Sequence, residues 1–350
     1  MLAEIPLIDV RDGGPLRHAR LRREAALLIR QACFAGVPRF LGGGLALADR
    51  GAAWWLSRSA SCYAAELEAI AELIAGTGIH TMNMSYQWGC TTAALPQAEA
   101  TMLLRTLDWP FAGLGRGVEV AWQKGPAGEF FNVTWPGAVG VITGMAPGRF
   151  AAVINQAPLR RRVWLPGCRA IDYGVNLVQT VARERGWPPD HLLRRAFETC
   201  GRFDEAVELL CREPVARPVI YTIAGVDPEA IVVIERTESS ARCLPGRAIV
   251  VNDWQEARPG WEPRGCDMRD LVGDNQRRRS EIAEGLENLH AKDCFAWVRP
   301  PVLNAETRVA VEANASAGEL RVQGYEPDGE IVSPATAIFD LARQPALHAA

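Results

Sequence analysis

The feature that most constrains the fold of this chain is the order in which helical and strand-like patterns follow one another. Residues 19–36 and 62–76 repeat apolar side chains at helical spacing. From about residue 101 the pattern changes to short strand-like runs that Gly and Pro turns separate, near 101–108, 117–124, 128–135, 138–145 and 149–155. Closely spaced runs of this kind predict an antiparallel sheet.

The second half of the chain repeats this alternation. Helical patterns return around 172–212, and a helix is predicted near 276–290. Further strands are predicted near 218–224, 230–236, 247–252, 306–314 and 318–325. The chain has 350 residues, 48% of them hydrophobic, which is enough to bury a substantial core. Helices alternating with blocks of strands predict an α+β fold in which helices cover two packed sheets.

The composition argues against several classes of protein. A net charge of −3 gives no overall electrostatic footprint for nucleic acid. The start of the sequence lacks a basic region followed by an apolar stretch, and no run of about 18 apolar residues occurs, so neither a secretory signal nor a spanning helix is expected. Nine scattered cysteines without a Cys-x-x-Cys pair predict a reduced, cytoplasmic setting.

A candidate nucleophile lies in segment 88–92, Trp-Gly-Cys-Thr-Thr, just before a strand-like run. If the chain were cut before Cys90, its thiol would sit beside a free α-amine that can take up and return the proton. Arg105 and Asp108 would approach Cys90 if an antiparallel strand pair returned them. The alternatives are that Cys90 is a small buried apolar residue, or that it pairs with His80.

Several motifs in chain order resemble the acid ceramidase and N-acylethanolamine acid amidase family, which is related to the choloylglycine hydrolases among the N-terminal nucleophile hydrolases. Arg105 and Asp108 fall where the family has an Arg-Asn-Met-Asp-Phe motif. Segment 137–144, Gly-Ala-Val-Gly-Val-Ile-Thr-Gly, is similar to a family strand and turn. Other similar stretches are 67–71, 78–79, 90–92, 203–207, 218–221, 232–234, 250–254, 278–280 and 301–304. The resemblance covers about two thirds of the chain.

The resemblance implies an αββα four-layer sandwich in which Cys90 is both nucleophile and self-cleavage residue. Arg105 would organise the thiol and Asp108 would hold the α-amine. Asn155 and Asn252 would form the oxyanion hole, where one well-aimed donor contributes roughly 3 kcal/mol of transition-state stabilisation. The network around the new N-terminus would include Arg278, with Arg279 as the alternative one position on. No cofactor and no metal are predicted, and the five histidines lack metal-ligand spacing.

The chain departs from the family pattern at Thr106, Leu107 and Trp109 of the Arg-Asn-Met-Asp-Phe motif, and at Gln156, which follows Asn155 where acid ceramidases have Glu. A neutral amide still forms hydrogen bonds, but it does not titrate. Gly89 fits the position before the cut, since its backbone freedom tolerates unusual peptide geometry. The predicted division is a helical segment, 1–89, retained after cleavage beside a catalytic subunit, 90–350.

The function that the resemblance implies is self-processing followed by hydrolysis of a linear amide in an N-acyl substrate, such as a ceramide-like or N-acylethanolamine-like lipid amide. Two alternatives remain: an acyltransferase in which an amine intercepts the thioester, and an uncut, non-catalytic binding protein of the same fold. The pair Trp54 and Trp55 has two interpretations, a core or subunit contact and a weak contact with a membrane surface.

Overall fold

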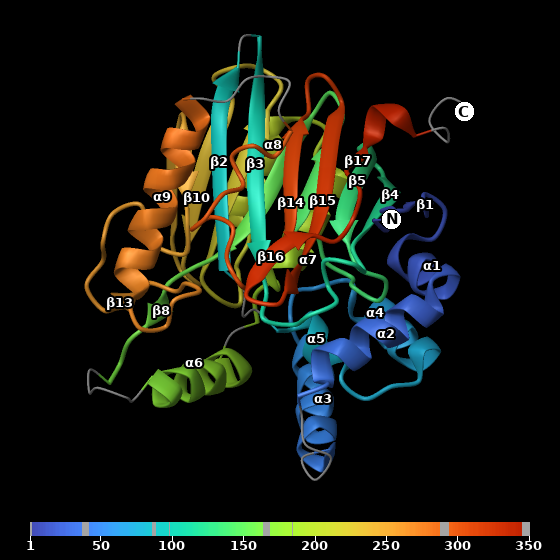
Figure 1. Ribbon diagram of the computed structural model, residues 1–350. Coiled ribbons are helices and arrows are strands. Elements are labelled where there is room, and N and C mark those ends of the chain that lie inside the picture. Colours follow the sequence, from blue (N-terminus) through green and yellow to red (C-terminus); the bar gives the residue numbers. More distant parts are fainter. Residues whose placement is uncertain are drawn as a thin grey trace.

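A computed structural model of the chain describes residues 2–36, 42–85, 89–97, 99–163, 169–183, 185–287 and 294–344. Most of the strands form two sheets that lie face to face (Figure 1). In the described residues the larger sheet has eight strands, in the order β1 (Leu7–Asp9), β4 (Glu119–Gly125), β5 (Gly128–Thr134), β6 (Thr143–Ala146), β7 (Phe150–Gln156), β9 (Val219–Gly225), β10 (Ile231–Arg236) and β11 (Ala241–Pro245). Its neighbours are antiparallel except for β1 and β4, which are parallel.

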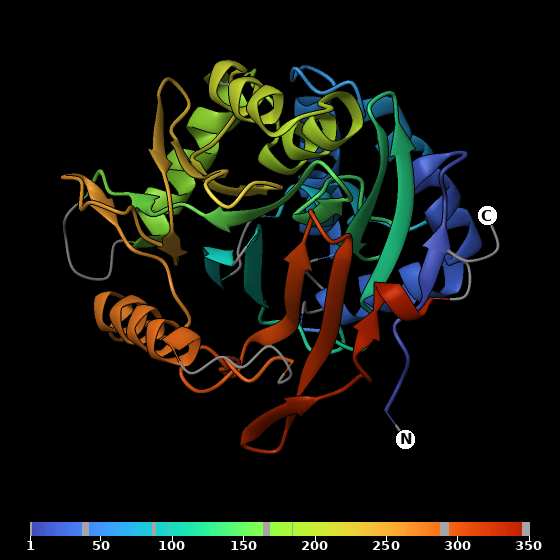
Figure 2. The same ribbon diagram turned by 90° about the horizontal axis from the view of Figure 1, so that it is seen from above.

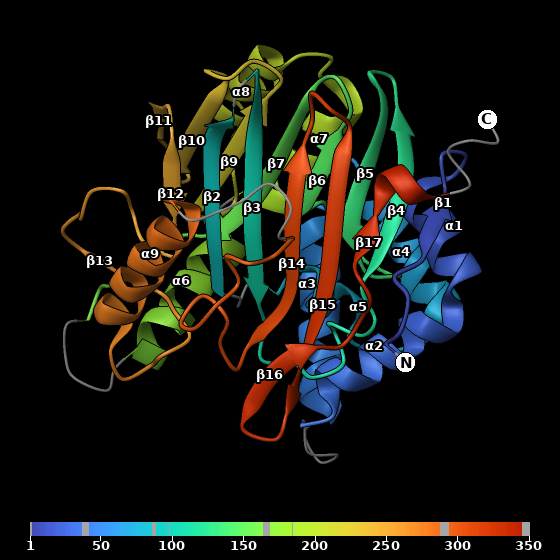
Figure 3. The ribbon, with the colours of Figure 1, turned by 45° about the horizontal axis from the view of Figure 1, so that its top comes forward.

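The smaller sheet begins with the segment of the candidate nucleophile. Its order is β12 (Ala248–Val250), β2 (Gly89–Gln97), β3 (Ala100–Asp108), β14 (Thr307–Asn314), β15 (Glu319–Asp328) and β16 (Ile331–Pro334), and β17 (Phe339–Asp340) also pairs with β15. In Figure 3, β2, β3, β14 and β15 lie side by side. A separate short pair joins β8 (Leu159–Arg160) to β13 (Trp261–Glu262).

Helices cover the outer faces of both sheets. On the larger sheet lie α7 (Pro189–Thr199) and α8 (Phe203–Arg212), and the ring of Phe197 stacks on Phe130 and Phe150. On the smaller sheet lies α9 (Leu271–Glu287), whose Ile282 packs with Ala93 and Leu104. The view from above separates α9, in orange, from α7 and α8, in yellow-green (Figure 2). This helix, sheet, sheet, helix layering confirms the predicted α+β, αββα class.

The N-terminal segment is mainly helical, but it also contributes to the larger sheet. Its helices gather beside one end of the sandwich (Figure 1). They are α1 (Gly14–Leu21), α2 (Arg23–Phe34), α3 (Gly42–Leu56), α4 (Ala64–Ile74) and α5 (Ile79–Asn83). The strand β1 precedes α1 in the chain and pairs with β4 of the larger sheet. Residues 1–89 therefore include a strand that the sequence pattern did not predict.

Most sequence-predicted elements correspond to an observed one. The helical patterns predicted around 172–212, interrupted at 187–189, correspond to three helices, α6 (Arg169–Arg183), α7 and α8. A short 3₁₀ turn, η2 (Leu341–Arg343), follows β17. Run 138–145 is irregular up to residue 142, and strand geometry begins only at Thr143, the start of β6. Residue 88 of the candidate cleavage segment and residues 288–290 of the last predicted helix lie outside the described residues.

The two adjacent tryptophans of α3 have different surroundings. Trp55 is buried, and its indole Nε1 donates a hydrogen bond to the Thr180 carbonyl at 3.0 Å. Trp54 is 51% exposed, and its ring lies under the guanidinium of Arg58. Trp55 is therefore a contact between α3 and α6. Within the described parts of the chain, no helix combines the length and apolar character needed to cross a bilayer.

Candidate active site

The hairpin of β2 and β3 carries three of the predicted catalytic residues, Cys90, Arg105 and Asp108. Its antiparallel register places Gly89 opposite Asp108 and Thr92 opposite Arg105. Cys90 lies between these two pairs, at the second residue of β2. The sequence-based expectation that returning strands carry Arg105 and Asp108 to Cys90 is therefore correct as a statement of geometry.

The thiol of Cys90 is buried and in contact with a guanidinium group. Arg105 Nη2 donates to Cys90 Sγ at 3.0 Å. Arg105 Nη1 donates to the Ile142 carbonyl at 2.8 Å and to Thr143 Oγ1 at 2.6 Å, which fixes the guanidinium plane. Burial raises the pKa of Cys90 to about 11, and the charge of Arg105 opposes that rise. The cation therefore favours the thiolate in surroundings that otherwise disfavour it.

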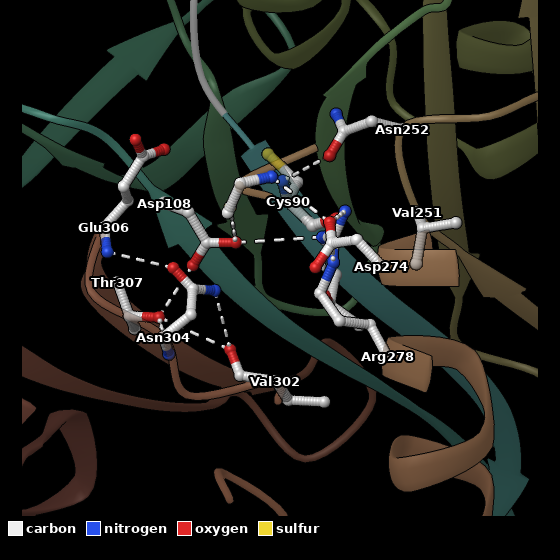
Figure 4. A network of polar contacts seen from close by, with 12 residues as sticks. Cys90, Asp108, Val251, Asn252, Asp274, Arg278, Val302, Asn304, Glu306 and Thr307 are labelled. Carbon is white, nitrogen blue, oxygen red and sulfur yellow. Dashed lines mark hydrogen bonds and ion pairs between the residues drawn. The ribbon is translucent and has the colours of Figure 1, made fainter. Parts of the chain in front are cut away.

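On the other side of Cys90, Asp108 and Arg278 form a buried pair (Figure 4). Arg278 Nη1 lies 3.8 Å from Asp108 Oδ2 and donates to the carbonyl oxygen of Cys90 at 2.8 Å. Thr307 Oγ1 donates to Asp108 Oδ1 at 2.8 Å. Burial raises the pKa of Asp108, and Arg278 opposes this shift. Arg279 instead donates to the Trp254 carbonyl at 3.4 Å, so the residue of the pair that reaches Cys90 is Arg278.

The two candidate oxyanion-hole residues contact β2 at different positions, Asn252 at Cys90 and Asn155 at Thr92. Asn252 Oδ1 accepts a hydrogen bond from Cys90 N at 2.7 Å, and its Nδ2 donates to the Gln156 carbonyl at 3.0 Å. Asn155 Oδ1 accepts from Thr92 Oγ1 at 2.8 Å. Asn155 Nδ2 donates to the carbonyls of residues 250 and 251, at 3.2 Å and 3.4 Å. In the intact chain, each carboxamide nitrogen is thus engaged with the backbone.

Gly89 is needed at its position for reasons of space. A β-carbon at this residue would lie 2.7 Å from Cys266 Sγ and 3.2 Å from Asp108 Cβ. Its backbone does not occupy the left-handed region, so the expectation based on conformational freedom is replaced by a steric one. Cys266 and Asp108 therefore leave no room for a side chain at residue 89, next to the peptide bond before Cys90.

Sequence reasoning missed several residues of this network. Asp274 Oδ2 lies 3.1 Å from Arg278 Nη2, and Asn275 Oδ1 accepts from the same nitrogen at 3.1 Å. Both precede Arg278 on α9, so the i, i+4 spacing of Asp274 and Arg278 was an available signal. Cys266 Sγ donates to Asp108 Oδ2 at 3.6 Å from a loop, where no local pattern marks it.

The remaining candidates lie outside this network. His80 Nε2 lies 3.1 Å from Glu68 Oε2, and its Nδ1 lies 3.8 Å from Asp49 Oδ2. The groups near its ring nitrogens are therefore carboxylates rather than Cys90. No group of three or more His, Cys, Asp or Glu side chains able to hold a metal ion occurs in the described part of the chain.

Comparisons with known proteins find sequence relatives and similar solved structures, whereas no family model matches the chain. The chain is 28% identical over 160 residues to the N-acylethanolamine-hydrolyzing acid amidase of Oryctolagus cuniculus, and 25% identical over 160 residues to that of Mus musculus. Each match covers 44% of this chain and 41% of the relative, so the chain matches less than half the length of these relatives.

Two solved structures are also similar. An N-acylethanolamine-hydrolyzing acid amidase ortholog of Caenorhabditis elegans has a TM-score of 0.48 and 20% identity, covering 64% of this chain and 91% of that one. A mutant conjugated bile acid hydrolase from Clostridium perfringens has a TM-score of 0.41 and 9% identity, covering 73% and 93%. The sequence matches agree with the motifs: this chain is similar to the N-acylethanolamine-hydrolyzing acid amidases, the family its sequence resembles.

Proposed function

We propose that this protein is a self-processing cysteine amidase that hydrolyses the linear amide bond of an N-acyl substrate. The observation that carries the proposal is the buried Cys90 thiol at the start of β2, with Arg105 Nη2 3.0 Å from its sulfur and Asp108 opposite the preceding residue. The names of the sequence relatives support amide hydrolysis.

Self-processing would begin with attack of Cys90 Sγ on the carbonyl carbon of Gly89. The S–C bond forms, the bond from that carbon to Cys90 N breaks, and the nitrogen takes a proton to become the free α-amine. Water then hydrolyses the thioester, which leaves a carboxylate on Gly89 and returns the thiol. Asn252 Oδ1, 2.7 Å from Cys90 N, supports this step because it accepts a hydrogen bond from the nitrogen before the cut and remains an acceptor for the amine afterwards.

The intact chain has the properties of an inactive precursor. Cys90 is fully buried, so a substrate does not reach its sulfur. The carboxamide nitrogens of Asn155 and Asn252 are engaged with backbone carbonyls rather than free to meet an oxyanion. Cleavage before Cys90 would free the α-amine beside the thiol. The pair of Asn side chains would then hold the oxyanion as the amine leaves, and water would release the acid from the thioester.

The acyl half of the substrate has an apolar place to bind. A cavity of about 120 Å³ lies between helices α2 and α5 of the N-terminal segment and the larger sheet. It is lined by Ile29, Ile79, Trp109, Trp135 and Ile142 among others. The carbonyl of Ile142 also accepts a hydrogen bond from Arg105, so this cavity reaches the residue that holds the thiol. An apolar acyl chain is the group that such a lining favours.

The proposal is tested by the intact masses of the purified protein and of Cys90→Ala, after neutral and acidic incubation. We expect the wild type to give fragments that begin at Met1 and Cys90, while Cys90→Ala stays whole. Cys62→Ala, at an exposed cysteine, is the matched control and should be cut like the wild type. An uncut wild type that also fails to hydrolyse N-acyl amides would instead support the binding-protein alternative.

A second arm separates hydrolysis from acyl transfer. The cut protein is incubated with an N-acyl amide in the presence of hydroxylamine or a primary amine, and the products are identified by mass spectrometry. We expect the free acid as the main product. A new amide that dominates at low amine concentration would instead make the protein an acyltransferase with the same thioester.

A further inference from the structure

Two cysteines outside the candidate active site are in contact where α8 packs against the edge of the larger sheet. Cys211 lies in the last turn of α8, and Cys243 is the middle residue of β11. Their sulfur atoms are 2.9 Å apart, whereas a disulfide bond measures about 2.05 Å. A small approach of the two side chains would therefore bring the sulfurs to bonding distance. The two residues are 32 positions apart, so no short Cys-Cys spacing in the sequence marks the pair.

The backbone on both sides of this pair is held in place. β11 lies at one end of the described strand order of the larger sheet, and Cys243 is opposite Ile234 of β10 (Figure 3). Helix α8 packs against both β10 and β11. Arg236 of β10 donates from Nη1 to the Leu210 carbonyl and from Nη2 to the Glu213 carbonyl, the latter at 2.8 Å. These bonds fasten the end of α8 to the sheet, so two regular elements, rather than loops, hold the sulfurs together.

The two thiols differ in exposure, which gives them different chemical roles. Cys243 is exposed, whereas Cys211 is partly buried. A small disulfide in solution therefore reaches Cys243 first. Burial raises the pKa of Cys211 to about 12, the contact with Cys243 adds to that rise, and the charge of Arg236 opposes it. Modification of Cys243 would remove one cause of this rise, which favours reaction of Cys211 as the second thiol.

We propose that Cys211 and Cys243 are a modification site, at which a small disulfide such as glutathione disulfide oxidises the two thiols to a crosslink between α8 and β11. The thiolate of Cys243 attacks one sulfur of glutathione disulfide, forms a mixed disulfide and releases one glutathione. Cys211 then gives its proton to water, and its thiolate attacks Cys243 Sγ and releases the second glutathione. Two protein thiols are oxidised to one disulfide, while one glutathione disulfide is reduced to two glutathiones.

The crosslink would stabilise the edge of the larger sheet. An edge strand has a neighbouring strand on one side alone, so β11 depends on β10 and on its contact with α8. A bond between residues 32 positions apart also restricts the unfolded chain, which favours the folded state. This inference goes beyond the proposed function and does not depend on it, because the oxidation involves neither Cys90 nor an amide substrate.

The first test asks whether glutathione disulfide joins these two residues. Wild type and Cys90→Ala are incubated with excess glutathione disulfide, the remaining thiols are alkylated, and peptides are analysed by mass spectrometry. In both proteins we expect the peptides of Cys211 and Cys243 to be joined, with a mass lower by two hydrogen atoms than the sum of the reduced peptides. Dithiothreitol should separate them. Cys62→Ala, at another exposed cysteine, is the matched control and should form the same crosslink.

Variants and thermal melts then test the order of reaction and the effect on stability. Cys211→Ser should keep a glutathionyl group on Cys243, because the second thiol is absent. The oxidised wild type should melt about 3–8 °C above its reduced form, and Cys211→Ser should show no such rise after the same treatment.

Three results would overturn the proposal. A glutathionyl group that stays on Cys243 of the wild type would mean that Cys211 does not reach the mixed disulfide. Joined peptides found only in covalent dimers, or only after denaturant is added, would mean that the folded chain does not bring the two thiols together. A crosslink that lowers the melting temperature would contradict the stabilisation of the sheet edge.

Discussion

Two cysteines lie beside Asp108, and the comparison between them teaches which thiol can serve as the nucleophile. Cys90 Sγ accepts a hydrogen bond from the guanidinium of Arg105 at 3.0 Å, whereas Cys266 Sγ donates to the carboxylate of Asp108 at 3.6 Å. Burial raises the pKa of both thiols. The neighbouring charge then acts in opposite directions, because Arg105 favours a thiolate at Cys90 and Asp108 opposes one at Cys266.

The largest expected effect is the loss of self-cleavage when the nucleophilic cysteine of the two is replaced. Cys90→Ala should abolish self-cleavage, while Cys266→Ala should leave its half-time within about threefold, because only the first removes the attacking sulfur. Denaturing gels over time, with N-terminal sequencing of the fragments, measure this. Cleavage that persists in Cys90→Ala and is lost in Cys266→Ala would exchange the roles of the two thiols.

The next effect concerns Arg105, the cation whose contact with sulfur distinguishes Cys90 from Cys266. Loss of a positive charge in contact with a thiol shifts its pKa by about one to three units, so Arg105→Gln should slow self-cleavage about 10- to 1000-fold. The matched control is Arg149→Gln, because Arg149 is also mostly buried and donates to the carbonyls of Phe197 and Cys200, away from Cys90. The folding stability of both variants is measured by thermal melts. Equal slowing in the two would show that the loss of a buried cation, rather than its contact with sulfur, is responsible.

A third effect is the dependence of self-cleavage on pH. Burial raises the pKa of Cys90 to about 11, so the thiolate fraction increases about tenfold for each pH unit below that value. If the thiolate attacks, the rate should rise from pH 7 towards pH 10 in the wild type and in Cys266→Ala alike. Gln156 has no proton to lose in this range. A rate that instead peaks under acidic conditions would point to a titrating carboxyl group, with Asp108 the first to test.

The sequence predicted one strand of the hairpin, 101–108, from local alternation, but it did not predict its partner β2. That Arg105 and Asp108 would approach Cys90 depended on an antiparallel strand pair, and the observed register of β2 and β3 provides it. Motif resemblance, rather than periodicity, pointed to Asn252 and Arg278, which contact the same residue from more than 150 positions away. Cys266 escaped notice because it reaches Asp108 from a loop, and a loop has no period that reveals its neighbours.

The β1 strand escaped notice for a different reason. It is three residues long, and its pairing with β4 depends on a parallel contact across more than 100 positions. Run 138–145 shows the opposite error, since its first five residues are irregular although Val139 and Val141 are fully buried. Burial alone therefore does not distinguish a strand from a well-packed irregular segment.

The smallest expected effect concerns Gly89, which precedes Cys90 in the chain and lies close to Cys266. Gly89→Ala would place a methyl group 2.7 Å from Cys266 Sγ, which should cost about 1–3 kcal/mol of folding stability and slow self-cleavage. Replacing Cys266 by Ala removes the obstructing sulfur, so the double variant should recover most of the loss. Thermal melts and cleavage half-times of the four proteins form a double-mutant cycle. Additive effects would mean that Asp108, the other near neighbour of Gly89, sets the space at the scissile bond.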